Sequence, residues 1–332
     1  ADEGFKAYII KGGPGTGKST IMKRVAGYFL KKGARCHLCP CSSDPNSLDA
    51  VILPEKKLAI LDGTPPHTLE PSFPGVCETI LNFGDFWDVN SFKAHKNEII
   101  ETSLLNKAYH KTASRYMEAA GKLILDSYKT ELACTDKEKT LQFSKNLCRK
   151  LIPQKANAAV GNEWIRFIEG ITPLGIVSYS DTVTDQVPTS VIIEDVYGAA
   201  SNIIIGCIRE YALKNGYEII TLKNPFLPSV ITDHIIIPDL GLAFATENAY
   251  IHFSSETRRI HARRFVSSQK LHLSRERLKF NKKAAKELFG SAASALSGAK
   301  RIHDKLEDYY IKSMNFDSLA EFSEKFTNNI LG

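Results

Sequence analysis

The sequence lacks any apolar run long enough to cross a bilayer, so a membrane-spanning helix is excluded and no membrane partner is expected. It also lacks a large excess of charge: the formal net charge of +6 over 332 residues permits contact with nucleic acid without arguing for it. The seven cysteines are an odd number, which speaks against a disulfide framework and fits a reducing compartment. The start, ADEGFKAYIIKG, has no initiator Met and no signal-peptide pattern, so we expect a trimmed start and a cytoplasmic protein.

The sequence does contain an internal repeat. The segment from Tyr8 to Asp62 aligns with the segment from Val191 to Thr246 at a spacing of 183 residues, which becomes 184 after one inserted residue. Because the chain is long for one compact domain and comfortable for two, we predict a duplicated domain, with the first copy in residues 1–155 and the second in residues 156–332. The matched pairs include Ile9 with Ile192, Gly15 with Gly198, Tyr28 with Tyr211, Gly33 with Gly216 and Pro54 with Pro238.

Both copies show the same order of expected elements. Strands that alternate with helices indicate an α/β fold with a parallel sheet and a helical covering. Each copy ends in a long, polar, Lys-rich stretch with helical spacing of its apolar residues, at 91–151 and 267–331, which we expect to be a helical extension. The expected strands are 7–10, 35–39 and 58–61 in the first copy and 191–193, 218–222 and 242–245 in the second, with helices at 18–32 and 201–215.

The most specific motif is a glycine-rich loop between the first strand and the first helix. Phosphate oxygens need several converging N–H donors, and glycines let the backbone wrap that closely. The helix that follows points its N-terminal N–H groups and its dipole at the same anion. This context supports a P-loop that binds a nucleoside triphosphate, most readily ATP with Mg²⁺. The expected nucleotide-binding residues are Gly12, Gly13, Pro14, Gly15, Thr16, Gly17, Lys18, Ser19 and Thr20.

Lys18, Ser19 and Asp62 are the expected chemical groups of this site. Lys18 is expected to reach the β- and γ-phosphates and to take part in catalysis, and the Ser19 hydroxyl is expected to ligate Mg²⁺. Asp62 follows the apolar run 58–61, which is typical of a strand that ends in a magnesium-binding carboxylate. Gly63 stands next, where many motor ATPases carry a water-activating Glu.

Two nearby turns offer further catalytic candidates. His67 or Thr64, just beyond the Asp62 strand, could orient water or substrate, although a Pro-stiffened turn with a surface His explains the same residues. Asp44 could act as a base or metal ligand, although Asp-Pro also predicts an ordinary Asx turn.

A cysteine cluster follows the first helix. Cys36, Cys39 and Cys41, with His37 between them, raise the alternative of a zinc site. No second cluster with ligand spacing follows, and the corresponding strand of the second copy has no Cys. Cysteines buried in a strand are therefore the favoured interpretation.

The second loop lacks the residues that act directly on a nucleotide. In the repeat alignment, Ser201 stands in place of Lys18 and Asn202 in place of Ser19. Asp195, together with Glu194, would place negative charge against a phosphate. The remaining replacements are Val196 for Gly13, Ala200 for Gly17 and Thr246 for Asp62. We therefore expect one working site and one degenerate site.

Together, four stretches resemble an uncharacterised family of tandem P-loop ATPases: residues 9–20, 43–49, 58–67 and the GDFWD segment 84–88. The resemblance covers nearly the whole chain and implies a P-loop NTPase-like fold in each copy. It also implies a second intact loop, from which this chain departs.

We expect Mg²⁺-dependent ATP hydrolysis coupled to a conformational change. A small-molecule or nucleotide kinase is one alternative, since kinases need no water-activating Glu after Asp62. A nucleotide-responsive protein that binds nucleic acid is another, and a homo-oligomer is compatible with either. Arginines of the second copy could also reach the Lys18 site to neutralise transition-state charge. The candidates are Arg258, Arg259, Arg263 and Arg264. A solvated helical face is the favoured explanation of this stretch, and contact with nucleic-acid phosphates is another.

Overall fold

The computed structural model describes residues 4–65, 68–156, 158–253 and 258–331. The chain forms two compact units. The first comprises residues 1–112 and 294–332, and the second comprises residues 113–293. These units do not follow the repeat halves 1–155 and 156–332, because each copy's helical extension contributes to both units.

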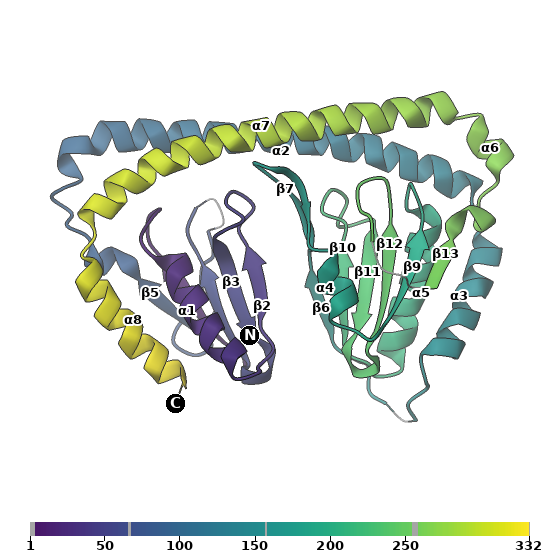
Figure 1. The fold of residues 1–332 in the computed structure, drawn as a ribbon, viewed down its shortest axis with the longest axis horizontal. Coiled ribbons are helices and arrows are strands. Elements are labelled where there is room, and N and C mark those ends of the chain that lie inside the picture. The colour runs from purple at the N-terminus through teal and green to yellow at the C-terminus, as the bar shows by residue number, and fades with distance from the viewer. Residues whose placement is uncertain (1–3, 66–67, 157, 254–257, 332) are drawn as a thin grey trace. The chain divides into compact units, whose positions relative to one another are not determined.

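The first unit holds a five-stranded sheet in the order β2-β3-β4-β1-β5 (Figure 1). Strands β4, β1 and β5 are parallel, whereas β3 runs antiparallel to both β2 and β4. The elements are β1 (Lys6–Lys11), α1 (Lys18–Lys31), β2 (His37–Pro40), β3 (Leu48–Leu53), η1 (Pro54–Lys56), β4 (Leu58–Asp62), β5 (Glu78–Asn82), η2 (Phe83–Phe86) and η3 (Lys93–His95).

The second unit repeats this arrangement. Its six-stranded sheet has the order β13-β9-β12-β11-β10-β6, with β12, β9 and β13 parallel and β11 antiparallel to its neighbours. Strand β6, the hairpin β7–β8 and helix α4 precede the repeated part. The elements are β6 (Glu163–Arg166), β7 (Glu169–Thr172), β8 (Gly175–Ser178), α4 (Asp181–Asp185), β9 (Thr189–Glu194), α5 (Ala199–Lys214), β10 (Ile219–Lys223), β11 (Thr232–Ile237), η4 (Pro238–Leu240), β12 (Leu242–Glu247), β13 (Arg258–His261), η5 (Ala262–Phe265) and α6 (Ser268–His272).

The sheets are therefore mixed, and the expectation of a parallel sheet in each copy was wrong for the β3 and β11 strands. The reason lies in the short connections. The chain passes from β3 to β4 through η1 and one further residue, and from β11 to β12 through η4 and one further residue. A connection this short reverses the chain, whereas a parallel crossover needs a dozen residues or more.

The long helical stretches expected at 91–151 and 267–331 are each two helices joined by a short corner. The first is α2 (Lys96–Cys134) followed by α3 (Lys137–Leu151), and the second is α7 (Arg275–Ser313) followed by α8 (Phe316–Leu331). Helices α2 and α7 have 39 residues each. None of the helices in the described ranges is long and apolar enough to cross a membrane.

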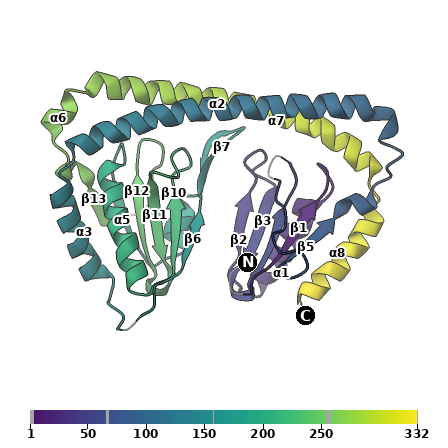
Figure 2. The same ribbon diagram turned by 180° about the vertical axis from the view of Figure 1, so that it is seen from behind.

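The hydrophobic core of each sheet includes a helix from the extension of the other copy. In the first unit, Leu319 and Phe326 of α8 join the core formed by α1 and the sheet. In the second unit, Leu147 and Cys148 of α3 join the core formed by α5 and its sheet. Helix α3 lies beside α5 in both views (Figures 1 and 2).

The GDFWD segment fixes the corner between α7 and α8 in the first unit. The Asp88 N–H donates to the Ser313 carbonyl at 2.8 Å, and the Asn315 N–H donates to the Phe86 carbonyl at 2.9 Å. The Trp87 ring packs against Tyr310. The segment therefore has a structural role in holding the second copy's extension on the first sheet.

Candidate functional site

The glycine-rich loop joins β1 to α1 and leaves the helix N-terminus uncapped. Gly17 has φ 84° and ψ 9°, a left-handed conformation that glycine adopts without steric cost. No side chain among the described residues caps α1. The first N–H groups of the helix have no partner within the helix, a feature that helices binding anions share.

Lys18 is buried at this N-terminus. Its Nζ donates to the Gly13 carbonyl at 2.6 Å and lies 3.6 Å from Asp62 Oδ2. The two residues meet because β1 and β4 are parallel neighbours, with Ile10 opposite Asp62. Burial lowers the pKa of Lys18, and the carboxylates of Asp62 and others nearby oppose this effect. The amine is therefore held at the loop, facing a carboxylate that ends the neighbouring strand.

Asp62 is fixed through its other oxygen. Its Oδ1 accepts hydrogen bonds from the N–H of Thr64 at 2.9 Å and from the Thr64 hydroxyl at 2.6 Å. Ser19 Oγ accepts from the Leu48 N–H at 2.9 Å, which ties α1 to β3. Hydrogen bonds therefore orient both side chains that are expected to ligate magnesium, Ser19 and Asp62. His67 lies outside the described residues.

The remaining loop residues vary in exposure. Thr16 is buried and its hydroxyl donates to the Gly13 carbonyl at 2.8 Å, which stabilises the turn of the loop. Pro14 and Gly12 are half-buried, whereas Thr20 is exposed at the surface of α1.

Asp44 forms a turn, in agreement with the Asx-turn alternative. Its Oδ1 accepts from the Asn46 N–H at 3.1 Å, and its Oδ2 lies 3.5 Å from Lys300 Nζ of α7. Lys300 also pairs with Asp304 at 2.5 Å. The Asp44 carboxylate is therefore engaged in a turn and an ion pair.

Sequence reasoning missed a set of residues from α7 that lie over the loop. A Cβ placed on Gly13 would come within 2.2 Å of the Tyr310 ring, and one on Gly15 would come within 2.9 Å of Ile311 and 3.2 Å of Glu307. Glu307 and Asp49 are also among the carboxylates whose charge acts on Lys18. Nearly 300 residues separate Glu307 from the loop, and a polar residue in a polar helix gives no signal of such a contact.

The three cysteines are half-buried and only Cys39 lies in a strand, so the expectation of cysteines buried in a strand was wrong. Burial raises the pKa of Cys36, and burial together with Asp49 raises the pKa of Cys41 to about 11. A raised pKa disfavours the thiolate that binds zinc. Within the described ranges, the groups of three potential ligand side chains do not include these cysteines.

The second loop is filled by the chain's own carboxylates. Asp195 Oδ2 accepts from the Ser201 N–H at 2.7 Å, and Glu131 Oε2 of α2 accepts from the Ala199 N–H at 3.0 Å. Burial and the neighbouring Asp195 raise the pKa of Glu131 to about 9, so the pair retains a proton at neutral pH. These oxygens occupy the N-terminus of α5 where an anion would otherwise bind.

The first turns of α1 and α5 make matching contacts to β3 and β11, respectively. Asn202 Oδ1 accepts from the Thr232 N–H at 3.0 Å, just as Ser19 accepts from Leu48. In the repeat alignment, helix α5 begins before the position that matches the start of α1. Gly198, which matches Gly15, precedes α5 in the left-handed conformation, with φ 81°, that Gly17 has before α1. The second loop is therefore shorter as well as acidic.

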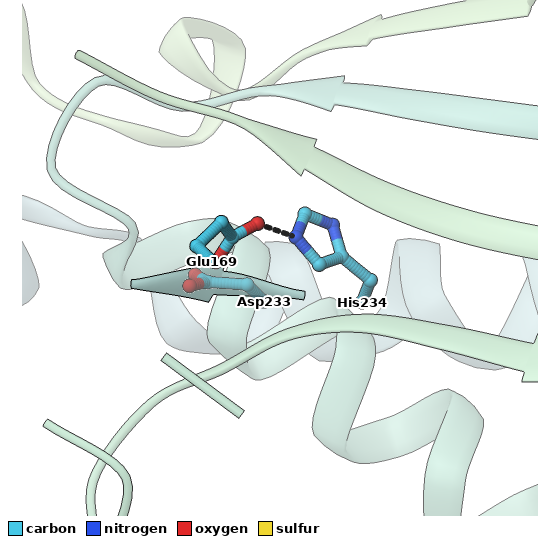
Figure 3. A group of neighbouring side chains, drawn as sticks. All are labelled: Glu169, Asp233 and His234. Atoms are coloured by element: carbon cyan, nitrogen blue, oxygen red, sulfur yellow. Dashed lines mark hydrogen bonds and ion pairs between the residues drawn. The ribbon is translucent and has the colours of Figure 1, made fainter. Parts of the chain in front are cut away.

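A buried polar cluster stands beside the second loop (Figure 3). His234 Nε2 lies 2.9 Å from Glu169 Oε1, and its Nδ1 accepts from the Thr246 N–H at 3.1 Å. A nitrogen that accepts from a backbone N–H carries no proton, so Nε2 is the donor to Glu169. Burial raises the pKa of the adjoining Asp233 to about 6. The ligand atoms of Glu169, Asp233 and His234 lie within 4.8 Å of one another, and His234 is already hydrogen-bonded through both ring nitrogens.

The arginine-rich stretch belongs to the second unit. Arg259 pairs with Glu194 at 2.9 Å and with Glu247 at 3.2 Å, while Arg264 lies over the rings of Phe143 and Phe265. Arg258, Arg263 and Arg264 line a hollow of about 390 Å³. That one of these arginines acts on the Lys18 site stays a prediction.

Comparisons of the chain with protein-family models, with curated proteins and with solved structures found no match. The function is therefore inferred from the residues of the site itself.

Proposed function

We propose that the chain binds ATP with Mg²⁺ in the glycine-rich loop and hydrolyses it, as a P-loop NTPase with one working copy and one degenerate copy. The observation that carries this proposal is the position of Lys18. Its buried amine lies at the uncapped N-terminus of α1, 2.6 Å from the Gly13 carbonyl and 3.6 Å from Asp62. An ammonium, free helix N–H groups and a strand-end carboxylate are what a magnesium-bound triphosphate requires.

Each group has a role that follows from its chemistry. The loop N–H groups and Lys18 bind the β- and γ-phosphates. Ser19 Oγ and Asp62 Oδ2 fit a magnesium ion, which prefers oxygen ligands and needs only one or two from the protein because it keeps several waters. Thr64 holds the other oxygen of Asp62, so the carboxylate is already oriented. The magnesium neutralises charge on the phosphates when it is bound.

Phosphoryl transfer to a small molecule or nucleotide is the second candidate. The residue after Asp62 is Gly63, and a kinase needs no water-activating Glu at that position because the substrate hydroxyl replaces water. Incubation with γ-labelled ATP, with and without a metabolite pool, separates the two: label appears as free phosphate in hydrolysis and in an organic product in transfer.

The binding site is tested by Lys18→Ala in titration calorimetry with MgATP. We expect a loss of binding of about 100-fold or more with an unchanged circular dichroism spectrum, because a charge-assisted phosphate contact is removed. Lys31→Ala is the matched control, since Lys31 is an exposed lysine at the other end of the same helix. Equal affinity of the Lys18 variant and the wild type would refute the site.

A further inference from the structure

We propose that Glu307 of α7 is the water-activating carboxylate of the nucleotide site and that His303 positions the same water. This inference rests on the proposed ATP hydrolysis and names the group that the Asp62 strand does not supply. Both residues lie in the second copy's sequence but belong to the first compact unit together with the loop.

Many motor ATPases carry this carboxylate directly after the magnesium-binding Asp, where this chain has Gly63 and little room for a side chain. A Cβ on Gly63 would come within 2.4 Å of Ile9 Cγ2 and within 3.2 Å of the Leu69 carbonyl oxygen. Real Cβ atoms do not come that close to their neighbours, so a Glu after Asp62 would force Ile9 to shift. A general base for water must therefore come from another element.

Helix α7 brings a carboxylate to the loop. Glu307 Cβ lies 3.2 Å from where a Cβ on Gly15 would stand, and the next turn of the helix packs Tyr310 and Ile311 along the same backbone. The charge of Glu307 acts on Lys18, the residue that binds the γ-phosphate in the proposed function. In the proposed function Asp62 takes the magnesium, with its other oxygen held by Thr64, and Glu307 is assigned to the water.

His303 stands one turn before Glu307. Its Nδ1 lies 3.6 Å from Glu307 Oε1 and, within the described residues, this buried nitrogen has no hydrogen-bond partner. Burial lowers the pKa of His303 below its ordinary value, and the charge of Glu307 opposes this effect. The two atoms are beyond direct hydrogen-bond length, and the proposed water lies beside the pair, within reach of both.

The reaction balances without a further reactant. The water oxygen forms a bond to the γ-phosphorus while the bond from that phosphorus to the β–γ bridging oxygen breaks, and ADP leaves with the electron pair of the broken bond. One proton of the water passes to the Glu307 carboxylate. Lys18 stabilises the charge on the phosphates throughout.

A metal ligand role for Glu307 is the competing explanation, because His303, Asp304 and Glu307 offer ligand atoms within 4.8 Å of one another. The ammonium of Lys300 lies 2.5 Å from Asp304, and the charge of Lys18 acts on His303. These two cations disfavour a third cation between them.

The test compares Glu307→Gln with Asp308→Asn, a neighbouring exposed carboxylate of the same helix, at increasing Mg²⁺. We expect Glu307→Gln to lower kcat by about 100-fold or more at every Mg²⁺ concentration with ATP affinity within about 3-fold of wild type, and Asp308→Asn to match the wild type. Glu307→Asp should recover part of the loss. His303→Gln should lower kcat by about 10-fold and leave KM nearly unchanged, since it removes orientation and not binding.

Three results overturn the inference: Glu307→Gln with turnover near the wild-type rate, recovery of that variant by saturating Mg²⁺, or an equal loss in Asp308→Asn. Should Glu307→Gln fail to bind ATP, the Glu307→Asp and His303→Gln variants decide, and wild-type kcat in both rejects the inference. A wild type that binds MgATP but releases no phosphate rejects hydrolysis itself, and a wild type that does not bind MgATP rejects the site.

Discussion

The Glu131 carboxylate of α2 accepts a hydrogen bond from the Ala199 N–H at 3.0 Å, at the N-terminus of α5. Asp195 binds the Ser201 N–H in the same turn. A triphosphate would have to displace both oxygens and then meet the charge of the pair.

We therefore predict one nucleotide per chain. Titration calorimetry with MgATP should give a stoichiometry of about one, and Lys18→Ala should remove that single event without uncovering another. Two equivalents of ATP per chain would show that the second loop opens to nucleotide despite its carboxylates.

The same pair predicts a pH-dependent stability. The pKa of Glu131 is about 9, above the ordinary value of 4.5, so the native state holds a proton that the unfolded chain releases as pH rises. The stability from this proton is complete below about pH 4.5 and is lost as pH rises towards 9. Glu131→Gln keeps an oxygen for the Ala199 N–H and cannot ionise.

Urea unfolding between pH 5 and pH 9 checks this prediction. The free energy of unfolding of Glu131→Gln should fall less over this range than that of the wild type, by about 1.4 kcal/mol for each unit by which folding raises the pKa of Glu131. Parallel curves for the two proteins would mean that Glu131 is ionised in the native state across the range.

Asp62→Asn should separate catalysis from folding. The amide oxygen of Asn can accept the two bonds from Thr64, so the strand end keeps its geometry, while the negative charge that faces Lys18 is lost. We expect a fall in Mg²⁺-dependent turnover of about 100-fold with nucleotide still bound. Turnover at the wild-type rate would move the magnesium carboxylate elsewhere, with Asp49 and Asp44 as the candidates to test.

Gly13→Ala should weaken the packing of α7 on the loop. The new Cβ would come within 2.2 Å of Tyr310, so the ring or the helix must move, and we expect a loss of about 1–3 kcal/mol in the free energy of unfolding. Gly27→Ala is the control, since no atom lies within 4 Å of its Cβ and alanine favours the helix. Tyr310→Ala should reduce the cost of Gly13→Ala in a double-mutant cycle; additive effects would contradict the contact.

The sequence predicted β1, α1, β2 and β4 with their counterparts, but not β3 (Leu48–Leu53), β5 or the matching strands β11 and β13. Asp44 and Pro45 predict a turn, and no strand is expected in the apolar run that follows, although Leu48, Val51 and Leu53 are buried in the sheet. Strand β3 runs antiparallel to β4 because the connection through η1 is short. The length of a connection sets this direction, and the pattern of side chains does not show it.

The candidate site was predictable only where its residues are close in sequence. Lys18 and Asp62 meet because a parallel pair of strands places both at one sheet edge, which a motif can indicate. The α7 residues cannot be found in this way. The apolar spacing of a long helix shows that it packs, but the two extensions are so alike that nothing in the pattern tells which sheet each one covers.

The crossed coverage of the sheets, α8 on the first and α3 on the second, bears on how such a chain arises. A single ancestral copy with the same helix path would have formed a domain-swapped dimer, in which the last helix of each chain packs on the sheet of the other. Gene duplication followed by fusion would turn such a dimer into one molecule and would leave one of its two loops free to change. Severed near residue 155, the present chain should yield two fragments that fold poorly apart and reassemble when mixed.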